Sequence, residues 1–254
     1  MRFFRAMLIA VAATAGVQAA MSQAVMAQTP AGTAYVVTYI ERDVRQMVNV
    51  HDLSAFQRFV RMCAARTGQL LNLSSLATDC GITHNTAKAW LSVLEASYIV
   101  FLLKPYFQNI NKRLIKTPKL YFYDTGLAAW LIGIHDPKFL AIHPMRGPLF
   151  ETFIIGELLK NCFNRGLPPN LYFFRDNVGN EVDLVMEEGG QLTPVEIKSG
   201  GTITKDYFTG LNYWTKLPLK MSGRKWLIYG GEQRQSRQGV EILPWKLLAK
   251  NIPH

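Results

Sequence analysis

Apolar residues recur at helical spacing after the first 34 residues. Val37 and Ile40 lie three positions apart in one stripe, and a second stripe begins at Phe56. Residues three or four positions apart share one face of a helix, so both stripes predict helices with a buried side. Gly68 follows the second stripe and is typical of a helix end. We therefore expect residues 35–68 to form a helical connector.

The next segment, residues 69–125, has the order of a helix-turn-helix motif followed by a hairpin. Ser74 predicts the start of a short helix, because a serine side chain can cap the free N–H groups there. Gly81 can adopt the left-handed conformation of a tight turn, and Thr83 is placed to cap a longer second helix. Two apolar strands follow, joined by the polar loop 109–113. This order predicts a winged helix.

Residues 126–254 alternate between apolar helices and short strands. A short helix is expected at residues 126–132, and a loop around His135 and His143 separates it from a long apolar helix at residues 149–163. Strands are expected at residues 171–175, 181–187, 193–199, 225–229 and 240–243. A further helix that carries Tyr207, Leu211 and Trp214 is expected between the third and fourth of these strands. The pattern as a whole predicts an α/β (α+β) fold class.

The first 34 residues have the pattern of a secretory signal. Arg2 and Arg5 precede an apolar run, and small residues follow it. The run is too short for a membrane span, so no integral membrane segment is expected. The alternative is that residues 1–34 come from a truncated or rearranged reading frame. The three cysteines lie far apart, as is typical of a reducing compartment, and we expect a cytoplasmic protein; export through residues 1–27 is the alternative.

The chain carries a net charge of +10, which favours a polyanionic partner such as nucleic acid or an anionic membrane surface. The charge is concentrated at the expected hairpin, because no acidic residue occurs between Glu95 and Asp124 while five basic residues do. We expect DNA to be the partner. The candidate nucleic-acid-binding residues are His84, Asn85, Thr86 and Lys88 at the start of the second helix, and Lys112, Arg113 and Lys116 in the wing. The alternative is an interdomain packing unit with a solvated wing.

Four charged residues of the last segment stand in apolar surroundings. Glu151 lies in the long helix, and Asp183 lies between two apolar residues of a strand. Glu196 and Lys198 are two positions apart in the next strand, so their side chains share one face. Such groups are costly to bury without a partner or a purpose. Glu157 is the runner-up to Glu151, on a more polar edge of the helix.

A helix carboxylate, a strand aspartate and a Glu-x-Lys pair, in this order, are similar to the site of the PD-(D/E)xK nucleases. Carboxylates supply the hard oxygen ligands that Mg²⁺ or Mn²⁺ prefers, and phosphodiester hydrolysis needs such a cation. The resemblance implies that Asp183 and Glu196 are metal ligands and that Glu151 is a third ligand or orients water. Lys198 would assist the nucleophile. The alternative is a buried salt bridge of Lys198 with Glu196 or Asp183, without catalysis.

Several segments together resemble one family, the bacterial and archaeal AAA-type ATP-binding proteins that end in the domain of unknown function 4143. These segments are residues 39–44, 120–127, 147–151 and 195–200, and the similarity runs from about residue 35 to residue 248. The resemblance implies a winged helix at residues 69–125. It also implies a restriction-endonuclease-like mixed sheet flanked by helices at residues 126–254.

Family members resemble a P-loop ATPase joined to these two domains, whereas this chain contains no Gly-x-x-x-x-Gly-Lys-Ser/Thr segment. We therefore expect no ATP site and no ATPase activity here, and a separate ATPase or another protein becomes a candidate partner. Three hypotheses stay open: a metal-dependent DNA-cleaving or DNA-processing protein, a non-catalytic DNA-binding or regulatory module that keeps the nuclease fold, and, from the leader alone, an exported protein of unrelated role.

Overall fold

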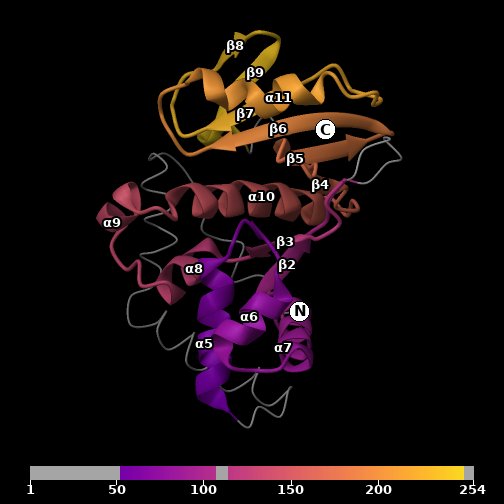
Figure 1. Ribbon diagram of the computed structural model, residues 1–254. Helices are drawn as coiled ribbons and strands as arrows, with labels where there is room; N and C mark the ends of the chain where they lie inside the picture. Colours follow the sequence, from indigo (N-terminus) through magenta and orange to yellow (C-terminus); the bar gives the residue numbers. More distant parts are fainter. Residues whose placement is uncertain (1–51, 107–113, 249–254) are drawn as a thin grey trace.

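The computed structural model describes residues 52–106 and 114–248 (Figure 1). The expected leader, the first part of the connector and the loop 109–113 therefore lie outside the described residues. Along the described part of the chain, no helix is long and apolar enough to cross a membrane. The expected mixture of helices and strands in an α/β architecture is confirmed.

Three helices and three short strands form the N-terminal unit, which lies at the bottom of Figure 1. They are α5 (Leu53–Ala65), β1 (Gln69–Leu70), α6 (Leu73–Cys80), α7 (His84–Ala96), β2 (Val100–Leu103) and β3 (Lys119–Phe122). Strand β3 lies between β1 and β2 and is antiparallel to both. The helices pack their apolar faces on this small sheet, for example through Phe59, Leu76 and Leu94, which are fully buried.

Local sequence explains the ends of these helices. Gly81 has the expected left-handed conformation, with φ 68°, between α6 and α7. The Thr83 side chain caps α7 as expected, accepting a hydrogen bond from the N–H of Thr86. The expected serine cap of α6 is wrong, because Asn72 is the cap and accepts from the N–H of Ser75. Asparagine is as good a cap as serine, so the local pattern allowed either.

The C-terminal unit consists of a six-stranded sheet with helices on both faces. The strands, in spatial order, are β4 (Leu171–Arg175), β5 (Glu181–Glu188), β6 (Gln191–Lys198), β7 (Trp226–Tyr229), β9 (Val240–Pro244) and β8 (Gln235–Arg237). Strands β4, β5 and β6 are antiparallel neighbours, whereas β6, β7 and β9 are parallel. Strand β8 returns antiparallel at the edge and was not expected from the sequence.

Helix α10 (Arg146–Asn164) and helix α11 (Thr209–Trp214) lie on opposite sides of this sheet (Figure 1). Two consecutive residues of β7 point to opposite faces of the sheet, because Ile228 belongs to the core on the α10 side and Leu227 packs with Leu211 on the α11 side. Two short 3₁₀ turns, η2 (Lys205–Phe208) and η3 (Trp245–Leu247), complete the unit.

Two short helices connect the units, α8 (Thr125–Leu131) and α9 (Pro137–Ile142). Helix α9 occupies the segment that was expected to be a loop around His135 and His143. Asp136 caps this helix through the N–H of Lys138, and Pro137 stands at its first position, where a proline costs no hydrogen bond. The expectation of a loop was wrong because a proline can begin a helix as well as prevent one.

The arms of the β2–β3 hairpin do not project freely from the small unit. Beyond β2, the carbonyl of Lys104 accepts from the N–H of Phe173 (3.1 Å), and the N–H of Tyr106 donates to the carbonyl of Phe173 (2.7 Å). On the returning arm, the N–H of Ile115 donates to the carbonyl of Arg175 (3.1 Å). Both arms therefore extend the edge of the large sheet at β4, and helix α10 lies between the two sheets (Figure 1).

Candidate functional site

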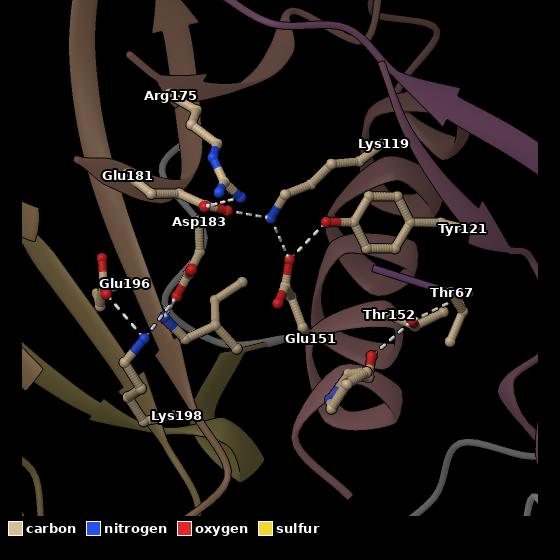
Figure 2. A network of polar contacts seen from close by, with 12 residues as sticks. Thr67, Lys119, Tyr121, Glu151, Thr152, Arg175, Glu181, Asp183, Glu196 and Lys198 are labelled. Atoms are coloured by element: carbon tan, nitrogen blue, oxygen red, sulfur yellow. Dashed lines mark hydrogen bonds and ion pairs between the residues drawn. The ribbon is translucent and has the colours of Figure 1, made fainter. Parts of the chain in front are cut away.

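The predicted site residues of the C-terminal unit come from helix α10 and strands β5 and β6 (Figure 2). Glu151 lies on the α10 side of the sheet, whereas Glu196 and Lys198 lie on the face that α11 covers. Glu151 comes from the second turn of α10, Asp183 from β5, and Glu196 and Lys198 from β6. The alternative Glu157 lies one and a half turns further along α10 and pairs with Lys160, so it is separate from this group.

Asp183 lies where the hydrogen-bond ladder of the sheet is broken. A β-bulge places Asp183 and Leu184 opposite the single residue Phe173 of β4. The regular pairing of β5 with β6 ends at Leu184, and the Oδ2 atom of Asp183 then accepts from the backbone N–H of Ile197 (2.8 Å). The Asp183 side chain thus replaces a backbone partner of β6. Bulges commonly redirect a side chain in this way beside functional sites.

Lys198 joins the carboxylates of the two strands. Its Nζ atom lies 2.7 Å from Oε1 of Glu196 and 3.1 Å from Oδ2 of Asp183. Glu196 and Lys198 share the face of β6 opposite to Val195 and Ile197, as strand periodicity predicted. The two carboxylates are 6% and 9% exposed, so this ion-paired group lies in a largely apolar setting.

The second carboxylate oxygen of Glu196, Oε2, is buried and has no hydrogen-bond partner among the described residues. Helix α11 approaches it closely at Gly210. A side-chain carbon placed on Gly210 would lie 2.9 Å from this oxygen and 2.3 Å from the carbonyl oxygen of Glu181. Glycine is therefore required at this position, because any larger residue would push α11 away from the site.

Lys119 and Tyr121 complete the network and were missed by the sequence-based site prediction. Both are on β3, in the N-terminal unit. The Nζ atom of Lys119 lies 3.1 Å from Oε1 of Glu151 and 2.5 Å from Oε1 of Glu181, and the Tyr121 hydroxyl donates to Oε1 of Glu151 (2.5 Å) (Figure 2). Arg175 of β4 binds the other oxygen of Glu181 at 2.9 Å.

A signal for these residues was present in the sequence. Lys119 and Tyr121 are two positions apart in an apolar strand and so must share one face. Lys119 is also one of the five basic residues between Glu95 and Asp124, on which the prediction of a basic wing was based. In the structure it is 3% exposed and bound to two carboxylates, so its charge is neutralised inside the protein and is not available to a partner.

Burial and charge change the proton affinities of the site in opposite directions. Burial, followed by the charge of Asp183, raises the pKa of Glu196 to about 8 against the lowering effect of Lys198. Burial also raises the pKa of Glu151, although Lys119 lowers it. For Lys119 and Lys198, burial lowers the pKa, but the carboxylates around each lysine outweigh this and hold the pKa above its ordinary value.

Among the described residues, no group of three or more His, Cys, Asp or Glu side chains has an arrangement ready for a metal ion. Asp183 and Glu196 are both turned to Lys198, and Glu151 is turned to Lys119 and Tyr121. The chemistry of the donors nonetheless suits a hard cation, because the oxygens are carboxylate oxygens and Oε2 of Glu196 has no partner. The expected metal ligands therefore stay a prediction.

The candidate DNA-binding residues differ in their exposure to solvent. His84, Asn85 and Lys88 are exposed on the first turns of α7, whereas Thr86 is half-buried and its hydroxyl is hydrogen-bonded to Thr83. Lys116 is exposed on the returning arm of the hairpin. Lys112 and Arg113 lie outside the described residues. Among the described candidates, the exposed side chains of α7 and Lys116 thus form the accessible part of the predicted surface.

Two family models match the chain. Residues 146–248 match a domain of unknown function (DUF4143), and residues 18–138 match a second domain of unknown function (DUF8612). The first match covers α10 and the six-stranded sheet, and therefore all four predicted catalytic residues. The part of the expected resemblance that concerns the domain of unknown function 4143 is confirmed.

Two curated proteins are similar to most of the chain. They are the uncharacterized protein Mb2031c of Mycobacterium bovis and the uncharacterized protein Rv2008c of Mycobacterium tuberculosis. Each is 32% identical over 203 residues, which is 79% of this chain and 44% of the relative. The chain thus spans less than half of the length of these relatives. No solved structure matches it.

Proposed function

We propose that this chain is a DNA-binding protein whose C-terminal domain has a restriction-endonuclease-like fold and cleaves phosphodiester bonds with the help of Mg²⁺ or Mn²⁺. Asp183 and Glu196 would hold the cation, and Glu151 would be a third ligand or orient water. Lys198 would position the attacking water and balance charge on the phosphate. The bound cation would supply electrostatic activation of the water and the phosphate.

The order of the elements supports the two domain assignments. In the N-terminal unit, helices α5, α6 and α7 precede a hairpin, and β3 lies between β1 and β2, which supports a winged helix. In the C-terminal unit, a mixed sheet lies between α10 and α11, and the strand carrying Asp183 precedes the Glu-x-Lys strand. This arrangement supports the PD-(D/E)xK comparison, whereas the match to DUF4143 carries no activity with it.

One observation carries the catalytic proposal. Lys198 lies between Asp183 and Glu196 where β5 and β6 separate, and Oε2 of Glu196 is buried there without a partner among the described residues. An unpaired buried carboxylate oxygen is costly. Lys198 alone does not satisfy the group, so the site is suited to a cation that takes this oxygen as a ligand.

A second candidate function is favoured by the rest of the network. Every charged group around Lys119 has an opposite partner, and no arrangement ready for metal occurs among the described residues. Such a network can exist for packing alone. The alternative is therefore a non-catalytic DNA-binding or regulatory module that retains the nuclease fold.

Metal titration combined with a cleavage assay separates the two functions. The purified full chain should bind Mn²⁺ in calorimetry, and Asp183→Asn should remove this binding while the protein stays folded, because asparagine can still accept from the N–H of Ile197. Lys198→Ala should keep metal binding and lose cleavage of DNA. The control Glu157→Gln removes a carboxylate of the same helix α10 outside the network and should change neither property.

The outcomes are distinct. Metal binding without cleavage of double-stranded DNA, single-stranded DNA or RNA would support the non-catalytic module. No metal response in the wild type, together with unfolding of Asp183→Asn, would identify the network as a structural ion pair and reject the nuclease proposal.

DNA binding is tested on helix α7. Lys88→Gln should weaken duplex binding and reduce its salt slope by about one, because one phosphate contact is lost. Lys246→Gln is the control, since this lysine pairs with Glu232 in the C-terminal unit. Equal affinities and slopes for the two variants would mean that α7 does not contact DNA.

A further inference from the structure

Two polar side chains of the N-terminal unit reach the candidate site of the C-terminal unit. Lys119 and Tyr121 stand on β3, the central strand of the small sheet, and both contact the same oxygen of Glu151, Oε1. Oε2 of Glu151 takes part in neither contact. Figure 2 shows Lys119 and Tyr121 on one side of Glu151 and Asp183 on the other.

The two side chains that bind Glu151 have further contacts of their own. Lys119 is itself fixed by a second carboxylate, Glu181, and lies over the ring of Phe173 at 5.4 Å. Tyr121 is fixed by its ring, which stacks on Phe101 with the centroids 5.4 Å apart. Glu151 is thus bound by two side chains that are themselves held in place, which restricts the orientations open to its long, flexible side chain.

The same units are joined beside this point by a second polar contact. The hydroxyl groups of Thr67 and Thr152 are 2.9 Å apart and buried, and Thr67 follows α5 while Thr152 is the neighbour of Glu151 in α10. Helix α10 is therefore anchored to the N-terminal unit at the turn that carries Glu151. A shift of β3 would move Glu151 with it.

We propose that Lys119 and Tyr121 are positioning residues, through which strand β3 of the N-terminal unit orients Glu151 for a divalent cation in the C-terminal site. The proposal rests on the proposed metal site. The site is then composite: its ligands belong to α10, β5 and β6, and the groups that set the orientation of the first ligand belong to the other unit. Groups that orient metal ligands through hydrogen bonds are a regular part of such sites.

The test measures Mn²⁺ affinity by calorimetry on the full chain, with thermal unfolding of the metal-free protein as the second measurement. Tyr121→Phe removes only the hydroxyl and leaves the ring stacked on Phe101, and we expect it to weaken Mn²⁺ binding about tenfold or more. The matched control is Tyr123→Phe, which removes a hydroxyl from a residue that follows β3 and contacts the ring of Phe101 outside the network. Both variants should melt close to the wild type.

Lys119→Gln separates positioning from simple charge. Removal of a positive charge beside carboxylates should tighten cation binding if electrostatics alone matters, since the cation then meets less repulsion. Positioning predicts the opposite, a weaker Mn²⁺ affinity, because Glu151 loses its anchor. The titrations are made well below the melting transition of each variant, so that loss of folded protein does not imitate loss of affinity.

The outcomes also separate this inference from the proposed function. Absence of Mn²⁺ binding in the wild type would remove the metal site and the inference with it. Wild-type binding with unchanged affinity in Tyr121→Phe, or tighter binding in Lys119→Gln, would overturn positioning by β3 and leave the metal site intact. Weaker binding in both variants, with Tyr123→Phe equal to the wild type, supports the composite site.

Discussion

The network contains two lysines with the same immediate chemistry and different surroundings. Lys119 and Lys198 each lie between two carboxylates, at distances of 2.5 to 3.1 Å. The partners of Lys119 come from α10 and β5 while the lysine itself comes from β3, so this group joins three elements. Lys198 pairs only within β5 and β6, its side chain is 29% exposed, and an oxygen of Glu196 beside it has no partner among the described residues.

The same kind of ion-paired lysine can therefore join two units in one place and form part of a binding or catalytic site in another. Around Lys119 the charges are balanced and the groups are held from several sides, as is expected where units are joined. Around Lys198 the charges are balanced only in part, and the lysine is accessible from solvent. Incomplete satisfaction of a buried polar group is often associated with a binding or catalytic role. Three predictions test the comparison.

The largest difference is expected from removing each lysine. Lys119→Met should destabilise the protein by about 3–5 kcal/mol, because it removes a buried charge that pairs with both Glu151 and Glu181. Lys198→Met should cost only about 1 kcal/mol, because the lysine is partly exposed and the raised pKa of Glu196 already favours its uncharged form at neutral pH. Urea unfolding at neutral pH without metal measures both values. Equal losses would remove the distinction between the two lysines.

An intermediate effect is expected where α11 covers the Lys198 side of the network. Gly210→Ala should destabilise by about 1–3 kcal/mol, because the added carbon meets the carbonyl of Glu181 and Oε2 of Glu196. The control Gly156→Ala, in helix α10, meets nothing within 4 Å and should be neutral or stabilising by up to about 1 kcal/mol. If thermal unfolding ranks the two variants in the opposite order, the close approach of α11 to Glu196 is refuted.

The smallest effect concerns the pH dependence of stability. The pKa of Glu196 is raised in the folded protein to about 8, so between its ordinary value and pH 8 the folded state binds a proton that the unfolded state has lost. The stability that this proton contributes is present at lower pH and is lost as the pH rises through this range. Relative to Glu196→Gln, the wild type should therefore lose about 1 kcal/mol per pH unit between pH 6 and 7.5.

Urea unfolding of both proteins in the presence of a chelator checks this slope. Parallel pH profiles for the wild type and Glu196→Gln would show that Glu196 is already ionised at neutral pH. In that case Lys198 and Glu196 would form an ordinary ion pair, and the two sides of the network would differ less than the structure suggests.

Local sequence was sufficient for most of the secondary structure and for one part of the site. Residues 171–175 form a strand with the expected bounds, and Gly81 and Thr83 make the expected turn and cap. Glu196 and Lys198 were correctly placed on one face of their strand. These features depend on side-chain periodicity and on hydrogen bonds within a few residues, so they are determined before distant parts of the chain meet.

The edges of the structure depended on contacts that no local pattern contains. Strand β8 exists because it pairs with β9, and the hairpin arms lie along β4 because Tyr106 finds its packing partners there. The arms of the β2–β3 hairpin have the same local sequence pattern whether they project into solvent or pair with the edge of a sheet. Only the position of the neighbouring unit decides between these two outcomes.

Taken alone, the sequence determined which residue types could form a site: three carboxylates and a lysine in apolar elements. The tertiary structure decided how they are used. The β-bulge at Asp183 brings its carboxylate to the backbone of β6, and β3 brings Lys119 and Tyr121 to Glu151 from 30 or more positions away in the chain. The physical reason is the cost of burying charge, because a buried carboxylate must find its partners wherever the folded chain places them, and that placement is set by the packing of both units.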